Sequence, residues 1–285
     1  MTDESRPTVR GRRLGSELRR LRESASKTTD DAASALECSR AKISRIETGA
    51  VGIRRLDLGI LLDLYGVTDP QARTTLETLA RESKKRGWWH DYGDTIPPAH
   101  ADFLGLEGDA RYIRTWQPLV VPGLLQTEDY ARALLQANPA AVRPDKIDQL
   151  VKMRMERKGI LTKPDPARFW GIIWEPALRC PVGGVDVRQA QLTYLREAAQ
   201  LPNVTLQVVP LELGATAGAC GAFVMYGFSD SPAPGAVFVE TLTTGYYLER
   251  EAELDGYGLA FEYLRSSALN PSESLDMITA ISAET

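Results

Sequence analysis

Cysteine, histidine and long apolar runs are scarce in this sequence. Its 285 residues include three cysteines and two histidines. Cys38, Cys180 and Cys220 are too few and too widely spaced for a disulfide framework or a structural zinc site. Because histidine occurs only at His90 and His100, most catalytic triads and histidine-based metal sites are excluded.

Targeting signals are also missing. No apolar run approaches the ~18 residues needed to span a bilayer, and the first residues lack the apolar core of a signal peptide. We therefore expect a reduced, cytoplasmic protein with no membrane partner, which is associated with the nucleoid when it binds DNA.

Catalytic motifs are equally absent, since the sequence has no glycine-rich phosphate loop and no Gly-x-Ser-x-Gly elbow. Glu175, Glu212 and Glu240 lie at the ends of expected strands, where carboxylates can bind a metal. No Asp/Glu-x-Lys companion follows them at short spacing, which favours structural or interface roles for Glu175 and Glu240. The sequence predicts a protein without catalytic residues, cofactor or metal; an enzyme with a regulatory head is the rival interpretation.

Charge divides the chain into two unlike parts, although the net charge of −4 is modest. Residues 1–86 contain 18 Lys and Arg against 13 Asp and Glu, whereas the remainder contains 16 against 25. A basic head on an acidic body is typical of a DNA-binding region joined to a domain that does not bind DNA. Apolar and charged contents of 43% and 25% are those of an ordinary globular protein.

Residues 28–49 have the pattern of two short helices joined by a tight turn. Thr28 is a suitable N-cap for the first helix, and Ser39 can cap the second. Ile43 and Ile46, three residues apart, predict the buried face of the second helix. This layout is that of a DNA-binding helix-turn-helix, whose second helix enters the major groove.

The pattern resembles the XRE family, the lambdoid repressor and Cro type of helix-turn-helix, over residues 12–68. Helix one is expected at 12–23 and helix four at 54–65. The family usually has Gln where this chain has Thr29, so the phosphate contact made there is shorter or absent. The matching features are Thr28, Ala33, Ser39, Ile43-Ser44 and Ile46-Glu47-Thr48-Gly49.

The resemblance implies specific roles for residues of the head. Arg22 and Glu47 match an ion pair that locks helix one to the recognition helix, the alternative being two solvated surface charges. Arg40, Ala41, Ser44 and Arg45 are the residues expected to read base edges. The residues expected to contact phosphates are Thr28, Thr29, Ser39, Lys42, Arg10, Arg12 and Arg13.

The predicted domain organisation has four parts. A basic flexible arm, residues 1–11, either follows DNA or remains a solvated tail. The helix-turn-helix domain occupies 12–68, a connecting helix and linker 69–100, and an α/β sensor or protein-interaction domain 101–285. Apolar residues of the connecting region, Leu76, Leu79, Trp88, Trp89 and Tyr92, are expected to support a homodimer. For the aromatic cluster, a packing seam is favoured over nucleic-acid stacking.

The remainder alternates between helical and strand-like patterns. Four strand candidates follow residue 203, and three of them lie close together with short connections, which predicts a partly antiparallel sheet. The fold class is therefore α+β: an all-α five-helix head followed by a mixed α/β domain. The expected helices are 102–110, 123–136, 145–161, 187–201, 251–268 and 271–281, and the expected strands are 111–116, 169–174, 204–210, 221–228, 236–240 and 246–249.

This second half resembles the WhiJ-like, antitoxin-like domain that follows XRE heads in actinobacterial regulators of development and antibiotic production. Within the family's Met-Arg-Arg-Gln-type run, represented here by residues 154–158, Lys158 departs from the usual Gln. The matching segments are 121–127, 130–131, 182–184, 191–192, 202–210, 221–223, 238–240 and 268–274.

The resemblance implies a transcriptional regulator whose second domain meets a small partner protein encoded nearby. The alternative is an antitoxin that neutralises a small toxin and represses its own operon. The loop 214–221 is either a partner-facing lid or a plain surface connection. The residues proposed for partner contact are Val121, Leu124, Leu125, Tyr130, Gly214 and Gly218.

Overall fold

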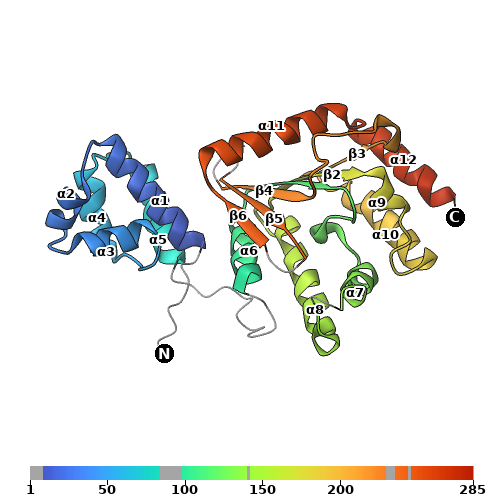
Figure 1. The fold of residues 1–285 in the computed structure, drawn as a ribbon, viewed down its shortest axis with the longest axis horizontal. Helices are drawn as coiled ribbons and strands as arrows, with labels where there is room; N and C mark the ends of the chain where they lie inside the picture. Colours follow the sequence, from blue (N-terminus) through green and yellow to red (C-terminus); the bar gives the residue numbers. More distant parts are fainter. Residues whose placement is uncertain (1–8, 84–97, 140–141, 229–234, 243–244, 285) are drawn as a thin grey trace. The chain divides into compact units, whose positions relative to one another are not determined.

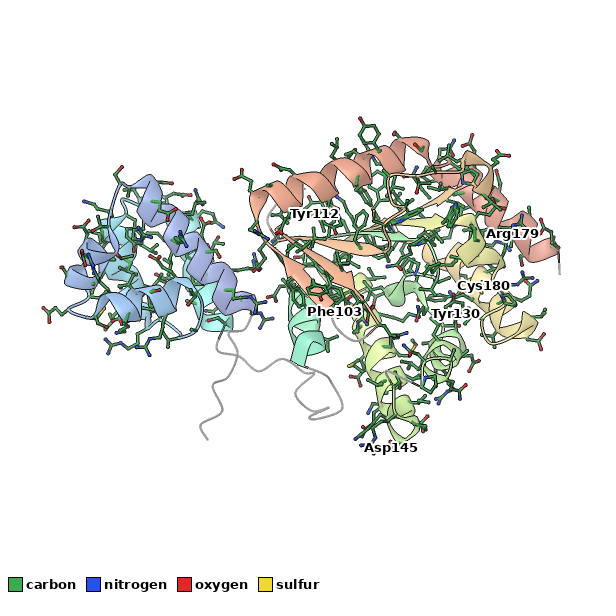
Figure 2. The ribbon with its side chains drawn as sticks, viewed as in Figure 1. Phe103, Tyr112, Tyr130, Asp145, Arg179 and Cys180 are labelled. Carbon is green, nitrogen blue, oxygen red and sulfur yellow. The ribbon has the colours of Figure 1, made fainter. Side chains whose placement is uncertain are left out.

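The computed structural model describes residues 9–83, 98–139, 142–228, 235–242 and 245–284 (Figure 1). The chain divides into two compact units, residues 1–90 and 91–285, and each is described by itself. The first unit is helical and the second combines a sheet with helices, which confirms the predicted α+β class (Figure 2).

The first unit, here called the head, contains five helices within its described residues. The first helix begins at Val9, three residues earlier than the sequence pattern predicts. Arg10 therefore lies in the opening turn of this helix, and placing it in a flexible arm over residues 1–11 was wrong. The helices are α1 (Val9–Ser24), α2 (Thr29–Ala35), α3 (Arg40–Glu47), α4 (Arg55–Leu64) and α5 (Pro70–Glu82).

Local capping chemistry sets several of these boundaries. The Thr28 hydroxyl accepts a hydrogen bond from the Asp31 amide at 3.1 Å, and the Asp31 carboxylate accepts one from the Thr28 amide at 2.7 Å. This reciprocal capping box satisfies amides that the first turn of α2 would otherwise leave unpaired. The Asp69 carboxylate caps α5 by accepting hydrogen bonds from the Gln71 and Ala72 amides, with Pro70 in the first turn, where no amide donor is needed.

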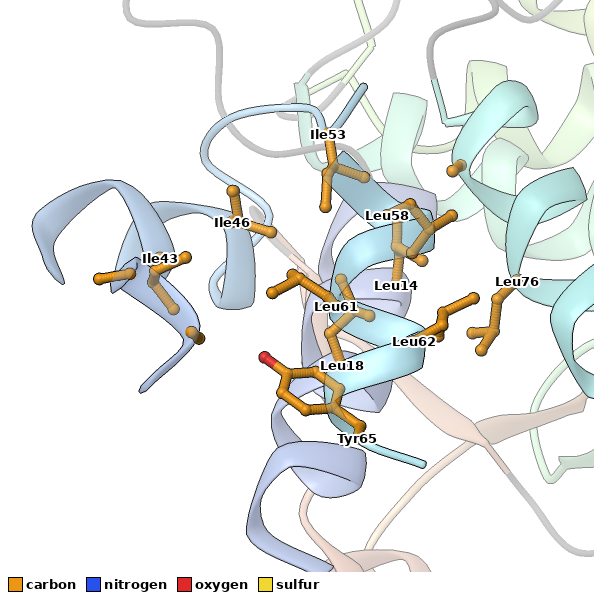
Figure 3. Close-up of a cluster of buried hydrophobic side chains, with 13 residues drawn as sticks. Leu14, Leu18, Ile43, Ile46, Ile53, Leu58, Leu61, Leu62, Tyr65 and Leu76 are labelled. Atoms are coloured by element: carbon orange, nitrogen blue, oxygen red, sulfur yellow. The ribbon is translucent and has the colours of Figure 1, made fainter. Parts of the chain in front are cut away.

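A single apolar core holds the five helices of the head together (Figure 3). Leu18, Ile43, Leu58 and Leu62 are fully buried in it. Leu76 of α5 is only 6% exposed and belongs to this core, with Leu79 packed against it. These two leucines therefore stabilise the head itself, and using them as evidence for a dimer interface was wrong.

The second unit, here called the body, has a sheet of six strands in its described residues. The strands are β1 (Tyr112–Gln117), β2 (Arg168–Trp174), β3 (Val204–Val209), β4 (Phe223–Gly227), β5 (Ala236–Glu240) and β6 (Gly245–Leu248). The helices are α6 (Pro98–Asp109), α7 (Glu128–Gln136), α8 (Ile147–Arg157), α9 (Glu175–Arg179), α10 (Val185–Ala198), α11 (Glu251–Ser267) and α12 (Pro271–Ala283). Short 3-10 helices are η2 (Gly123–Leu125), η3 (Pro144–Lys146), η4 (Lys158–Leu161) and η5 (Leu211–Leu213).

The strand order is β3-β2-β1-β4-β5-β6, and the pairing changes character at β1. β1, β2 and β3 run parallel, because helical crossovers connect them. β4 pairs antiparallel with β1, and β5 and β6 continue the antiparallel pairing. The predicted partly antiparallel sheet is confirmed.

Helices cover both faces of the sheet (Figure 1). Phe261 and Leu264 of α11 pack into a core that includes Trp116 and Met225. On the other face, Phe103 of α6, labelled in Figure 2, stacks against Phe238 with ring centroids 4.8 Å apart. The body thus has an interior of its own on each side of the sheet.

Candidate nucleic-acid interface

Helices α2 and α3 cross closely because small and branched side chains meet between them. Ala32 and Ala33 of α2 are buried, as are Ile43 and Ile46 of α3. Ser39 begins α3, and its hydroxyl accepts a hydrogen bond from the Lys42 amide at 3.3 Å. The structure therefore contains the predicted helix-turn-helix layout, with α3 in the position of the recognition helix.

The opposite side of α3 is open to solvent. Ala41, Ser44, Arg45 and Thr48 are exposed and lie at i, i+3, i+4 and i+7, so they share one face of the helix. We call these four residues the α3 face. Thr48 was absent from the predicted contact set, although its spacing from Ala41 would have identified it.

The two arginines predicted to read bases differ in their surroundings. Arg40 is exposed and forms an ion pair with Asp30 of α2. Arg45 is exposed, and its side chain has no hydrogen bond or ion pair among the residues that the structure describes. Arg45 can contact a base without breaking another interaction, whereas Arg40 must first exchange its carboxylate partner.

The side chains predicted to contact phosphates are partly engaged within the head. The Thr28 hydroxyl takes part in the capping box. Lys42 Nζ lies 3.6 Å from Asp57 Oδ2, and Arg54 donates two hydrogen bonds to the same carboxylate. These arginine hydrogen bonds lower the pKa of Asp57. Lys42 is thus held toward α4, so its charge has a defined position beside α3.

The other predicted phosphate ligands lie at the surface. Ser39 is exposed, and Thr29 is half-buried at the start of α2. Arg10, Arg12 and Arg13 are half-buried in the opening turns of α1. Together they add positive and polar groups to the head, and their contact with DNA remains a prediction.

A buried ion pair joins α1 to the end of α3. Arg22 Nε donates to Glu47 Oε1 at 2.6 Å, and Arg22 Nη2 donates to Oε2 at 3.1 Å. Their side chains are 10% and 8% exposed, which rules out the alternative of two solvated charges. A further bond runs from Arg22 Nη1 to the Lys27 carbonyl at 2.9 Å. The hydrogen bond to Glu47 raises the pKa of Arg22, so the guanidinium remains charged, and its bonds to Glu47 fix the end of α3.

Close backbone contact supplements this ion pair. A Cβ atom placed on Gly15 of α1 would overlap the carbonyl groups of Ile46 and Glu47. Burial raises the pKa of the neighbouring Tyr65 hydroxyl to about 12. The C-terminal end of α3 therefore rests directly on α1, which gives the α3 face a rigid support.

The apolar residues proposed for partner contact lie in the body's interior. Val121, Leu124, Leu125 and Tyr130 are each at most 3% exposed. The Val121 amide donates a hydrogen bond to the Tyr130 hydroxyl at 3.2 Å, which closes the segment on itself. Their assignment as partner anchors was wrong, because an apolar segment beside a Pro-Gly turn fits a core as well as an interface.

The glycine loop is only partly available to a partner. Gly214 is exposed and has a positive φ of 72°. Gly218 is buried, and its carbonyl accepts a hydrogen bond from Trp116 Nε1 at 2.9 Å. Because Gly218 is buried and bonded in this way, naming it as a partner-contact residue was wrong, whereas the role of the loop as a whole remains a prediction.

Exposed apolar residues instead gather on the outer side of α11. Leu259 and Tyr263 are 61% and 60% exposed. Ala252 and Gly256 continue the same face at a spacing of three to four residues, and both are exposed. We call these four residues the α11 face. The α11 face contains no charged residue, although it lies opposite the buried side of the helix and is exposed to solvent.

The carboxylates considered for metal binding are structural where the structure describes their contacts. Glu175 accepts hydrogen bonds from Arg179 Nε at 2.6 Å and from the Leu211 amide at 2.8 Å. Within the described ranges, no group of three or more His, Cys, Asp or Glu side chains could hold a metal ion. The aromatic residues Trp88, Trp89 and Tyr92 lie outside the described residues.

Comparison with known families matches both units. A helix-turn-helix domain matches residues 13–76, and a domain of unknown function (DUF5753) matches residues 100–280. No curated protein and no solved structure matches the chain. Among the residues described, no helix is both long and apolar enough to cross a membrane.

Proposed function

The chain belongs to the family defined by the domain of unknown function DUF5753, and from this premise we propose that it is a sequence-specific transcriptional regulator. The observation that carries the proposal is the α3 face, with the unengaged Arg45 at its centre. The buried Arg22–Glu47 pair supports it, since base readout requires a recognition helix of fixed position. The narrower XRE and WhiJ-like resemblance adds a role in development or secondary metabolism to this proposal.

Sequencing the genomic fragments that the purified full-length chain selects tests the DNA-binding proposal. A regulator enriches fragments that share one short sequence. If the enriched fragments shared no sequence, the head would be a non-specific DNA binder and the proposal would be contradicted.

We further propose that the chain acts as a homodimer. Helix α3 has eight residues, so one copy reads few base pairs. Two copies on successive turns of a palindromic site multiply the specificity. Light scattering with and without such a duplex measures the stoichiometry directly, and one chain per duplex would contradict the proposal.

The body, in this proposal, binds the small protein encoded beside it, and the α11 face is the docking surface. Glu251 and Asp255 are exposed and border this face on one side, as does Glu262, which also pairs with Arg265 at 2.6 Å. If the α11 helices of two copies packed antiparallel around Leu259, the acidic residues of one copy would lie beside those of the other, and like charges would repel. A partner segment with an apolar centre and basic flanks fits this surface better than a second copy does.

Changing Leu259 to Asp is expected to weaken partner binding at least tenfold, because a carboxylate replaces an apolar anchor at the centre of the α11 face. Isothermal titration with the neighbouring gene product measures this effect. Leu119→Asp is the matched control, since Leu119 is 73% exposed and lies outside α11. If the two variants bound the partner with equal affinity, the docking site would lie outside the α11 face.

Partner binding is proposed to change DNA occupancy. A coupling of about 1–3 kcal/mol between the two ligands suffices, and it acts equally in both directions. Titrating operator DNA with and without the partner measures it. Growth arrest on expression of the neighbouring gene alone would instead favour the antitoxin role.

A further inference from the structure

Three cationic side chains gather at the end of α8 and the start of η4, on the sheet face that α6 covers. They are Arg154, Arg157 and Lys158. Arg157 is paired conventionally: its Nε and Nη2 donate to the two carboxylate oxygens of Glu107 at 2.7 and 2.8 Å. The guanidinium also lies 4.5 Å from the ring centroid of Phe103. One buried carboxylate thus neutralises one of the three cations.

Arg154 has no such carboxylate. Its Nη1 donates to the side-chain oxygen of Gln126 at 2.9 Å, and it forms no salt bridge within the described part of the chain. Protein atoms surround it densely while part of its surface remains exposed. Burial and the neighbouring Arg157 lower the pKa of Arg154 to about 10, so the side chain is still protonated at neutral pH. Glu240 and Glu107 attract it only at longer range.

Lys158 approaches the same glutamine from the next turn. Its Nζ donates to the Gln126 backbone carbonyl at 3.0 Å and lies 3.8 Å from the ring centroid of Tyr194. Gln126 is 2% exposed, and its side-chain amide donates to the Val121 carbonyl at 2.8 Å. Two cations therefore converge on one rigidly held neutral residue.

A second unsatisfied group lies in the same region. The Tyr226 hydroxyl is buried and has no hydrogen-bond partner among the described residues. Burial raises its pKa well above the usual value, with Glu107 contributing to the rise and Arg157 opposing it. Buried charges are normally paired and buried hydroxyls normally bonded, but among the described residues Arg154 has no salt-bridge partner and the Tyr226 hydroxyl has no hydrogen bond.

We propose that Arg154 and Lys158 bind a small anionic molecule through a carboxylate or phosphate group. The unbonded edge of the Arg154 guanidinium offers parallel N–H donors, which match two oxygens of such a group. The ammonium of Lys158, which donates to the backbone carbonyl of the same Gln126, supplies a second charge beside it. The body is then a sensor domain that responds to an anionic metabolite, independently of the protein-docking face on α11.

Thermal unfolding of the full chain in the presence of simple anions tests this site. Tryptophan fluorescence reports mainly on the body, because Trp116, Trp170 and Trp174, three of the five tryptophans, lie there. The probes are inorganic phosphate and malonate, each compared with sodium chloride at equal ionic strength. Probe at about five times its dissociation constant is expected to raise the midpoint by about 3 °C, the size that ligand linkage gives for a unit of this length.

Two variants decide whether Arg154 is responsible. Arg154→Gln is expected to abolish the anion-dependent shift, whereas Lys152→Gln, which removes an exposed charge from the same helix, is expected to preserve it. Lys158→Gln provides a second test should Arg154→Gln not fold. A shift with only one probe identifies the head group. No shift in the unmodified chain, or an equal shift in Arg154→Gln, would overturn the proposal.

Discussion

Replacing Arg22 with Ala is expected to destabilise the head by about 3–5 kcal/mol, the range for breaking a buried ion pair by removing one partner. The substitution leaves the Glu47 carboxylate, 8% exposed, without its two hydrogen bonds. It also removes the donor to the Lys27 carbonyl. Because Glu47 ends α3, the recognition helix should lose its fixed position as well as its stability.

Calorimetry of the full chain measures this effect. Arg20→Ala is the matched control: Arg20 lies on the same helix and pairs with Glu17, but their side chains are 62% and 37% exposed. Its loss should cost less than about 1 kcal/mol. The double variant Arg22→Met, Glu47→Leu should recover much of the stability, because no charge is then buried alone. An equal effect of Arg22→Ala and Arg20→Ala would contradict this interpretation.

Replacing Arg45 with Ala is expected to remove about 1–3 kcal/mol of base discrimination per half-site, the contribution of a bidentate arginine on guanine. On a palindromic site bound by two copies, the loss applies twice. Affinity for random DNA should fall much less, because Arg45 makes no specific base contact on such DNA. Only one positive charge near the phosphates is lost. Gel-shift titrations with operator and random duplexes measure both quantities.

Two further variants separate base readout from general electrostatics. Lys42→Ala should weaken binding to operator and random DNA alike, because Lys42 is assigned to phosphate. Arg19→Ala, which removes an exposed arginine of α1, should leave the ratio of the two affinities unchanged. If Arg45→Ala also left that ratio unchanged, Arg45 would not read a base.

Features set by neighbouring residues were predictable from the sequence. The caps Thr28 and Ser39 begin helices as expected, because capping depends on residues within one turn. The predicted strand at residues 236–240 matches β5. The head's fold follows from such signals, since its five helices are short and its apolar residues have helical spacing.

Other features depend on tertiary contacts and escaped the sequence pattern. The predicted helix over 123–136 is broken at Gln126, whose backbone is extended and whose side chain is drawn into the polar contacts with Arg154 and Val121. Helix α9 was missed because its five residues are too few for a periodicity.

Burial was the least predictable property of the candidate sites. Val121 and Leu124 lie in the core, whereas the equally apolar Leu259 and Tyr263 are exposed. Helical spacing identifies an apolar face but not what covers it. The charge imbalance around Arg154 was likewise hidden, because Glu107 is distant in sequence and joins Arg157 only through the fold.

Methylation interference on the selected operator tests the central claim, that the head reads DNA through the α3 face, most directly. Methylation of guanine N7 blocks the acceptor that a bidentate arginine requires. We predict one sensitive guanine in each half-site, with the two separated by about one helical turn, and loss of that sensitivity in Arg45→Ala. Binding that is insensitive to methylation at every guanine, or equally sensitive in Arg45→Ala, would contradict the claim.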